Sequence, residues 1–377
     1  LGVDRETIVS LCQDKASYYK TIARKIEKDT ADKITEFVTE TGVSGVHLET
    51  DTKRYYPYGS LASTVLGFTG TDNNGAYGLE SYYNSVLAGT PGKVVSITDG
   101  KSGEMPFSYR KMYDAEDGDS LVLTIDTYMQ QVLEKYLNQI VEQFNVQNRC
   151  AGIIMNPKTG EIYAMATKPD FDPNNPQALG DSREVEKLET LEGEEYTSAL
   201  QAAQFTQWRN KAISDPYEPG SVFKIITLSA AIDSKSVSLD DTFNCGGSIN
   251  VSGTVFHCWR SYNPHGVQTL TETLINSCNP AYVQIGQRLG GENFYRYAES
   301  YGLTTGQTTG VDLPGEATSV FLSEEALTRP GMVELGSASF GQSNKVTPLQ
   351  MITAVSAAVN GGNLMEPYVV KQVVDSD

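Results

Sequence analysis

The stretch Tyr217-Glu-Pro-Gly-Ser-Val-Phe-Lys224, followed by an apolar run to Ile232, gives the clearest structural signal in the chain. Pro219 and Gly220 interrupt the preceding segment, so a helix is predicted to begin at or near Ser221. Free backbone N–H groups at a helix start favour developing negative charge. Lys224 follows three residues later on the same helix face. A lysine amine that burial keeps neutral can accept a hydroxyl proton, so this stretch predicts a nucleophile and its base within one helical turn.

The Ser-x-x-Lys pattern is weak by itself, because it also occurs at Ser17–Lys20 and Ser108–Lys111. Those two copies lack a helix-start signal and are interpreted as surface residues. A second motif, Ser277-Cys-Asn279, ends the helical stretch 270–277 just before a proline. Two further Ser-x-Asn copies, at 248–250 and 261–263, are interpreted as loop residues. The pairing of Ser221-x-x-Lys224 with Ser277-x-Asn279 is what favours serine acyl-transfer chemistry.

The elements on either side of this motif predict a mixed α+β protein. Residues 117–126 read as an apolar strand that leads into a helix, and 150–155 and 161–166 read as a hairpin around the turn 156–160. Residues 51–120 are rich in Tyr, Gly and Thr, which predicts β-ribbons and loops. We therefore expect an amino-terminal β-rich domain over 1–115 and an α/β domain over 116–377.

Composition excludes several classes of protein. The 377 residues include 47 acidic and 29 basic side chains, a net charge of −18. Such a surface repels phosphate, so no nucleic-acid partner is expected. No apolar run approaches the roughly 18 residues that span a bilayer. The chain begins with Leu1 and not with Met, which is compatible with processing or with an upstream membrane anchor.

The chain resembles the class B penicillin-binding proteins, the serine D,D-transpeptidases of cell-wall synthesis. Stretches that match this family follow its order over most of the chain: Arg54–Gly67, Gly78–Glu80, Leu87–Gly89, Leu123–Asp126, Asn156–Met165, Tyr217–Ser221, Ser277–Pro280 and Gly341–Gln350. The pattern of Cys, Trp, His and Gly residues between Cys245 and Asn279 is most similar to that of elongation or sporulation members from Firmicutes. The resemblance implies an amino-terminal pedestal of the dimerisation type and a transpeptidase domain.

The resemblance also implies roles for four residues. Ser221 would be the acylated nucleophile and Lys224 its base, Ser277 would relay a proton to the leaving amine, and Asn279 would hold the substrate amide. The substrates would be peptidoglycan stem peptides that end in D-Ala-D-Ala, with β-lactams as inhibitors, no cofactor, and a glycosyltransferase as membrane partner. The protein would work on the outer face of the bacterial cytoplasmic membrane, tethered by an amino-terminal transmembrane helix absent from this chain.

One expected motif is missing. The family carries a Lys-Thr-Gly or Lys-Ser-Gly strand well over a hundred residues beyond Ser-x-Asn, and the chain ends at Asp377 before reaching one. Lys158–Gly160 and Lys101–Gly103 match this motif in sequence, but both precede Ser221. They are therefore interpreted as unrelated to that strand. The transpeptidase domain is therefore expected to lack its carboxy-terminal part. A β-lactam-binding sensor and a catalytically silent scaffold remain as alternative functions.

Cysteine and histidine gather between residues 245 and 265. Cys245, His257, Cys258 and His265 suggest zinc, but their spacing lacks the paired Cys-x-x-Cys of structural zinc sites, and no metal is predicted. An extracytoplasmic protein permits a disulfide, and a Cys245–Cys258 pair closes a short loop. Free thiols are the third interpretation. Cys278, between Ser277 and Asn279, is expected to be a packed thiol, with oxidation sensitivity as the alternative.

Overall fold

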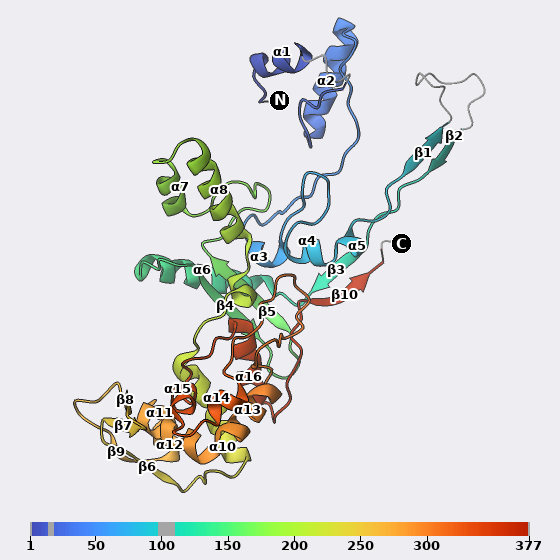
Figure 1. The fold of residues 1–377 in the computed structure, drawn as a ribbon. Coiled ribbons are helices and arrows are strands. Elements are labelled where there is room, and N and C mark those ends of the chain that lie inside the picture. The colour runs from blue at the N-terminus through green and yellow to red at the C-terminus, as the bar shows by residue number, and fades with distance from the viewer. Residues whose placement is uncertain (1, 14–18, 97–109, 376–377) are drawn as a thin grey trace.

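The computed structural model describes residues 2–13, 19–96 and 110–375. The chain forms an elongated molecule with the amino-terminal helices at one end and a helical lobe at the other (Figure 1). The amino-terminal part contains α1 (Arg5–Gln13), α2 (Lys28–Thr41), α3 (Ser63–Leu66), α4 (Gly78–Tyr82), α5 (Asn84–Leu87), β1 (Lys93–Ser96) and β2 (Arg110–Tyr113). Neither α1 nor α2 buries a residue. Strands β1 and β2 pair antiparallel in a narrow ribbon.

The middle of the molecule is a layer of strands covered by one long helix. It contains β3 (Ser120–Leu123), α6 (Thr127–Gln143), β4 (Cys150–Met155), β5 (Ile162–Lys168), α7 (Ser182–Leu188), α8 (Gly193–Trp208) and β10 (Val370–Val374). Strands β4 and β5 form an antiparallel hairpin, and β10 pairs antiparallel with β3. The side chain of Asp126 caps α6 by accepting a hydrogen bond from the Met129 N–H at 2.8 Å. The carboxy-terminal strand therefore returns to the point where the middle layer begins.

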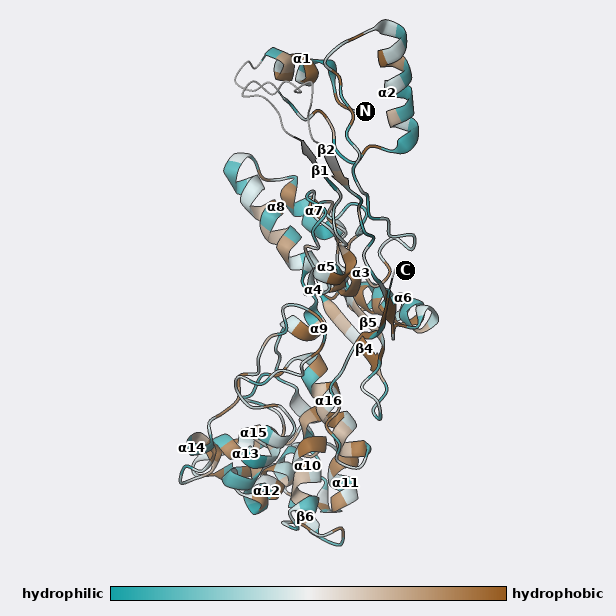
Figure 2. Cartoon of the chain, turned by 90° about the vertical axis from the view of Figure 1, so that its right-hand side faces the viewer, coloured by the Kyte–Doolittle hydropathy of each residue, from teal (hydrophilic) through white to brown (hydrophobic). Residues whose placement is uncertain are grey.

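The helical lobe carries the candidate site. Its helices are α9 (Lys211–Ser214), the 3₁₀ helix η1 (Gly220–Phe223), α10 (Lys224–Asp233), α11 (Leu270–Ile275), α12 (Asn279–Leu289), α13 (Gly291–Ser300), α14 (Glu324–Leu327), α15 (Val333–Ala338) and α16 (Pro348–Val359). Phe223 packs its ring against Phe294 and Phe321, with centroids 5.9 and 6.2 Å apart. Hydrophobic colour concentrates in β4, β5, α10 and α16, whereas α2 is mostly hydrophilic (Figure 2). Two buried apolar clusters lie around η1, α10 and α12 and hold the site, and another lies in the middle layer around β5, α3 and α4.

Two short hairpin-like pairs flank this lobe. They are β6 (Thr242–Cys245) with β9 (Gly266–Thr269), and β7 (Ser248–Val251) with β8 (Thr254–His257), both antiparallel. In the first pair Cys245 lies opposite Gly266, so the end of β6 meets the start of β9. The chain then enters α11 through a capping box formed by Thr269 and Glu272. These strands therefore lead directly to the turn that carries Ser277.

The predicted mixed α+β class is confirmed, as are the strand–helix unit β3–α6 and the hairpin β4–β5. The region 51–120 differs in detail, because its described residues, 51–96 and 110–120, contain one ribbon and the three short helices α3–α5. Val65 and Leu79 on α3 and α4 are almost fully buried, so tertiary packing stabilises these short helices. In residues 2–13, 19–96 and 110–375, no helix has both the length and the apolarity that crossing a bilayer requires.

Candidate active site

Ser221 lies in η1, immediately before α10, as the sequence predicts. The backbone N–H of Gly220 donates a hydrogen bond of 2.9 Å to the Gly341 carbonyl, which joins this turn to a loop 121 residues further along the chain. A Cβ on Gly341, whose φ is +87°, would lie 2.0 Å from the Gly220 carbonyl oxygen. Only glycine tolerates both that approach and that φ. Ser221 itself is exposed.

Lys224 lies one turn after Ser221 and is 1% exposed. Its Nζ is 3.2 Å from Ser221 Oγ and 2.9 Å from Ser277 Oγ. It also donates to the Ser277 carbonyl at 2.8 Å and to Asn279 Oδ1 at 2.7 Å. The amine therefore contacts the other three residues that the sequence singled out.

Ser277 occupies the turn between α11 and α12 with a φ of +47°, a conformation that L residues rarely adopt. The turn is held by hydrogen bonds from the N–H of Ser277 to the Leu274 carbonyl and from the N–H of Cys278 to the Thr273 carbonyl, 3.0 and 3.1 Å long. The Ser277 hydroxyl donates a hydrogen bond to Ser221 Oγ at 2.9 Å. Such strained residues persist where the surrounding structure over-determines them, commonly at functional sites.

Asn279 begins α12 and uses both ends of its amide. Its Oδ1 accepts from Lys224, and its Nδ2 donates to the backbone carbonyl of His257 at 3.2 Å. Tyr282 follows Asn279 by three residues on the same helix face, and its ring lies beneath Lys224 with its centroid 5.4 Å from Nζ. Sequence reasoning missed Tyr282, although this spacing could have indicated it.

The surroundings of Lys224 change its basicity. Burial lowers the pKa of Lys224 to about 8, because a desolvated ammonium is disfavoured, and the nearby Cys278 and Cys258 offset this only in part. Burial also raises the pKa of Tyr282 far above its ordinary value, so its hydroxyl stays neutral. A neutral Lys224 amine is therefore accessible near neutral pH, next to an exposed hydroxyl.

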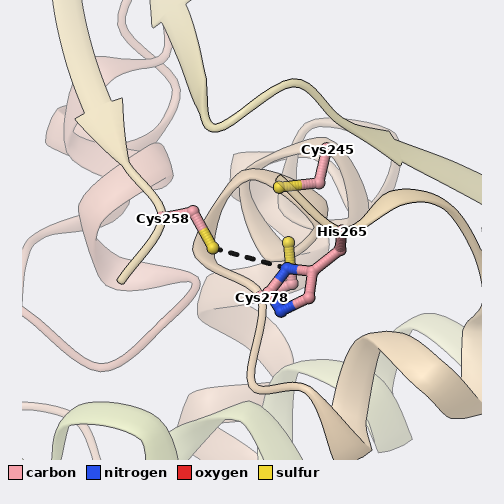
Figure 3. A group of neighbouring side chains, drawn as sticks. All are labelled: Cys245, Cys258, His265 and Cys278. Carbon is pink, nitrogen blue, oxygen red and sulfur yellow. Dashed lines mark hydrogen bonds between the residues drawn. The ribbon is translucent and has the colours of Figure 1, made fainter. Parts of the chain in front are cut away.

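The cysteines near the site are gathered more closely than their sequence spacing indicates. Cys245, Cys258 and Cys278 are buried, and their sulfurs converge with the ring of His265 (Figure 3). Cys245 and Cys258 are free thiols in the structure, so their predicted pairing stays a prediction. His257, which the sequence placed in the cluster, belongs to β8 and is exposed; Cys278 takes its place among the converging groups. Cys278 lies outside the segment 245–265 in which the sequence gathers cysteine and histidine, so the sequence did not place it in the cluster.

The remaining motif copies fall on other elements or outside the described residues. Lys158–Gly160 forms the turn of the β4–β5 hairpin. The interpretation of residues 248–250 as loop residues is wrong, because they lie in β7 and pair with β8, whereas residues 261–263 lie in a loop as interpreted. The serines of the two other Ser-x-x-Lys copies, Ser17 and Ser108, fall outside the described residues, as does Lys101–Gly103. The turn placement of Lys158 agrees with its interpretation as unrelated to a substrate-lining strand.

Comparison with known families places the chain. The family described as the penicillin binding protein transpeptidase domain matches residues 150–377, and the penicillin-binding protein dimerisation domain matches residues 1–123. The chain thus combines a penicillin-binding protein dimerisation domain with a transpeptidase domain, as class B penicillin-binding proteins do. The chain belongs to the penicillin-binding protein family.

Particular relatives agree. The chain is 38% identical to stage V sporulation protein D of Bacillus subtilis over 378 residues, 100% of this chain and 53% of that protein. It is 30% identical to the crystal structure of penicillin-binding protein 3 from Mycobacterium tuberculosis, with a TM-score of 0.67, covering 86% of this chain and 62% of that one. The structure of penicillin-binding protein 2X from Streptococcus thermophilus is 26% identical with a TM-score of 0.71, covering 100% and 52%. The chain spans about half the length of the curated relatives it matches.

Proposed function

We propose that this protein is a peptidoglycan D,D-transpeptidase that crosslinks stem peptides ending in D-Ala-D-Ala through an acyl-enzyme on Ser221. The observation that carries the proposal is the buried Lys224 amine, which lies within hydrogen-bond distance of the hydroxyls of both Ser221 and Ser277. A serine hydroxyl is a weak nucleophile until a base accepts its proton, and a nearby amine with a lowered pKa can do so.

Acylation follows from this arrangement. Neutral Lys224 accepts the proton of Ser221 while Oγ forms a bond to the carbonyl carbon of the penultimate D-alanine. The backbone N–H of Ser221, at the start of η1, binds the developing oxyanion. As the peptide C–N bond breaks, Ser277 donates its proton to the leaving D-alanine amine and recovers one from Lys224. Asn279 holds the peptide amide beside the hydroxyls.

Transfer then reverses the proton path. The amine of a neighbouring stem peptide attacks the ester carbonyl and gives up its proton towards Ser277 and Lys224. The bond from Ser221 Oγ to carbon breaks, and Oγ takes a proton back from Lys224. A β-lactam ring presents its amide carbonyl to the same nucleophile but keeps its leaving amine attached, so Ser221 stays acylated.

The names of relatives support the same setting. Curated relatives are named peptidoglycan D,D-transpeptidases, and penicillin-binding protein 3 of M. tuberculosis has been solved in complex with aztreonam and with ampicillin. By extension, this protein works on the extracytoplasmic face of the cytoplasmic membrane, anchored there by an amino-terminal helix, beside a membrane glycosyltransferase that supplies glycan strands. It uses no cofactor for acyl transfer.

The test is covalent labelling of the full-length protein with a fluorescent penicillin. Peptide mapping is expected to find the adduct on Ser221, and Ser221→Ala is expected to abolish it, whereas Ser17→Ala and Ser108→Ala, which change the serines of the other Ser-x-x-Lys copies, retain it. With a D-Ala-D-Ala stem peptide and an acceptor amine, the protein should release D-alanine and form a crosslinked dimer. An adduct on another residue would overturn the site, and labelling without turnover would indicate a β-lactam sensor.

A further inference from the structure

Four side chains beside the acyl-transfer site form a compact cluster with the composition of a metal centre. The sulfurs of Cys245, Cys258 and Cys278 and one ring nitrogen of His265 all lie within 4.8 Å of one another (Figure 3). They come from four separate segments: the end of β6, the residue after β8, the residue before β9 and the residue that precedes α12. A cluster assembled from four segments depends on the tertiary fold, not on local sequence.

The distance between Cys258 and His265 fits two ligands of a tetrahedral ion. With Zn–S near 2.3 Å and Zn–N near 2.1 Å, tetrahedral ligands lie about 3.6 Å apart for nitrogen and sulfur and about 3.8 Å apart for two sulfurs. His265 Nδ1 lies 3.5 Å from Cys258 Sγ. The other ring nitrogen, Nε2, is buried and has no hydrogen-bond partner in the described part of the chain. In the described part of the chain, the hydrogen bond of the imidazole is therefore with a sulfur of the cluster itself.

Backbone N–H groups around the sulfurs also favour a metal site. The backbone N–H groups of Gly247 and His265 favour the negatively charged form of the Cys245 sulfur, and that of Ala281 does the same for Cys278. Metal-bound thiolates carry negative charge, and polar groups around a metal site orient its ligands. Gly247 has a φ of +92°, which lets the chain turn back after Cys245.

We propose that Cys245, Cys258, Cys278 and His265 bind one zinc ion in a closed structural site. Three thiolates and one imidazole are a ligand set that zinc takes in tetrahedral structural centres, and four protein ligands leave no position for water or substrate. A disulfide between Cys245 and Cys258 would use two of these groups and leave Cys278 and His265 unaccounted for. The metal uses all four.

The ion stabilises the turn that carries two residues of the acyl-transfer site, a role that rests on the proposed function. Cys278 lies between Ser277 and Asn279, and Asn279 donates to the carbonyl of His257, the neighbour of Cys258. A metal that binds Cys258 and Cys278 fixes both partners of that hydrogen bond. The four ligands are therefore positioning residues: they hold the strained Ser277 turn without touching substrate.

The first experiment measures metal content in the full-length protein, purified under reducing conditions and passed through a metal-free gel-filtration column. We expect about one zinc per chain, as one closed site requires, and a loss of at least tenfold in Cys245→Ser, Cys258→Ser and Cys278→Ser. Cys12→Ser and Cys150→Ser change thiols outside the cluster and should retain zinc. His265→Cys should retain it too, because four cysteines also bind zinc. Folding of each variant is checked by circular dichroism.

Cobalt provides a second readout on the wild-type protein. After chelator treatment, added Co²⁺ should give the absorption of tetrahedral thiolate-bound cobalt, and Zn²⁺ should displace it. Folded wild-type protein that has free thiols and binds neither ion would overturn the proposal. A Cys245–Cys258 disulfide in the protein as isolated would do the same, because two of the four ligands would then be oxidised.

The positioning role is tested separately through acylation by penicillin. Zinc removal and His265→Ala should slow the acylation step at Ser221 at least tenfold, with a smaller change in the initial binding of penicillin, and His265→Cys should restore the rate together with the metal. Equal acylation rates with and without zinc would refute the positioning role while leaving the metal site intact. Failure of Ser221 labelling in zinc-loaded wild-type protein would instead count against the proposed transpeptidase function.

Discussion

Lys224 is the residue on which the proposed chemistry most depends, since its amine contacts the polar side chains of Ser221, Ser277 and Asn279. A charged ammonium would donate to all of them but could accept no proton. Burial lowers its pKa to about 8, so the neutral form is populated near physiological pH. Two predictions follow from this balance.

The first is that Lys224→Arg slows acylation by about 10²-fold or more, because a guanidinium cannot lose its proton near neutral pH. The charge and much of the volume are retained, so the fold should persist. Lys158→Arg, on the exposed turn of the β4–β5 hairpin, is the matched control and should acylate normally. Stopped-flow measurement of β-lactam acylation decides between them, and an unchanged rate in folded Lys224→Arg would refute the role of base.

The second concerns pH. Below the pKa of about 8, the neutral fraction of Lys224 falls about tenfold per pH unit, so the acylation rate should rise with pH and level off above about pH 8. The amine faces the uncharged side chains of Ser221, Ser277 and Asn279, the sulfurs of Cys258 and Cys278, and the ring of Tyr282. The Tyr282 hydroxyl stays uncharged through this range. Rates measured at constant ionic strength test the slope. A profile that is flat between about pH 6 and pH 8 would show that deprotonation of Lys224 does not limit acylation.

At the scale of elements, the Ser221 turn depends on a loop that is remote in sequence. Gly341 brings its backbone against Gly220, and the hydrogen bond between these two glycines fixes the start of η1. The loop from 341 to 344 belongs to the stretch 341–350 that resembles the family. Its amino-acid sequence does not indicate which element it contacts. The structure gives it a role as the support of the nucleophile turn.

Replacing Gly341 by alanine should therefore disturb Ser221 without altering any polar side chain. The added Cβ would meet the Gly220 oxygen at 2.0 Å, and the φ of +87° is strained for alanine, a cost of about 1–3 kcal/mol before the clash. Gly362→Ala is the matched control, because its φ is +89° and nothing lies within 4 Å of the new Cβ. Urea unfolding and penicillin acylation should show a larger loss in Gly341→Ala. Equal losses in the two variants would mean that backbone strain alone matters.

The sequence predicted the elements whose signals are local. The helix start at Ser221, the one-turn spacing to Lys224 and the turn at Ser277 follow from periodicity and from the Pro and Gly positions, and the structure brings the three side chains together. Features made by long-range contact were missed. Cys278 lies 20 residues beyond Cys258, and helices α3–α5 are too short for a periodic pattern, so their packing could not be read from spacing.

At the scale of the whole molecule, a buried polar cluster joins the amino-terminal part to the middle layer. Glu134 on α6 accepts hydrogen bonds from the Ala62 N–H at 2.8 Å and from Gln130 at 2.7 Å. Lys168 at the end of β5 is 3% exposed and pairs with Glu134 at 2.8 Å and with Asp170. Because one carboxylate contacts three segments, this cluster couples the segment before α3 to the layer that precedes the active-site lobe.

Removing the cation from this cluster should therefore destabilise the molecule strongly. In Lys168→Met the buried carboxylate of Glu134 and the partly buried carboxylate of Asp170 lose their counter-ion, which costs about 3–5 kcal/mol. Burial already raises the pKa of Asp170, so its protonation at lower pH should relieve part of the loss, and the deficit should shrink as the pH falls. Lys187→Met breaks an exposed pair with Glu184 and is the control, with little effect expected. Urea unfolding at about pH 5 and pH 8 measures both variants. Equal stability of the two, or a deficit that grows on acidification, would show that Lys168 does not act as the counter-ion that joins these segments.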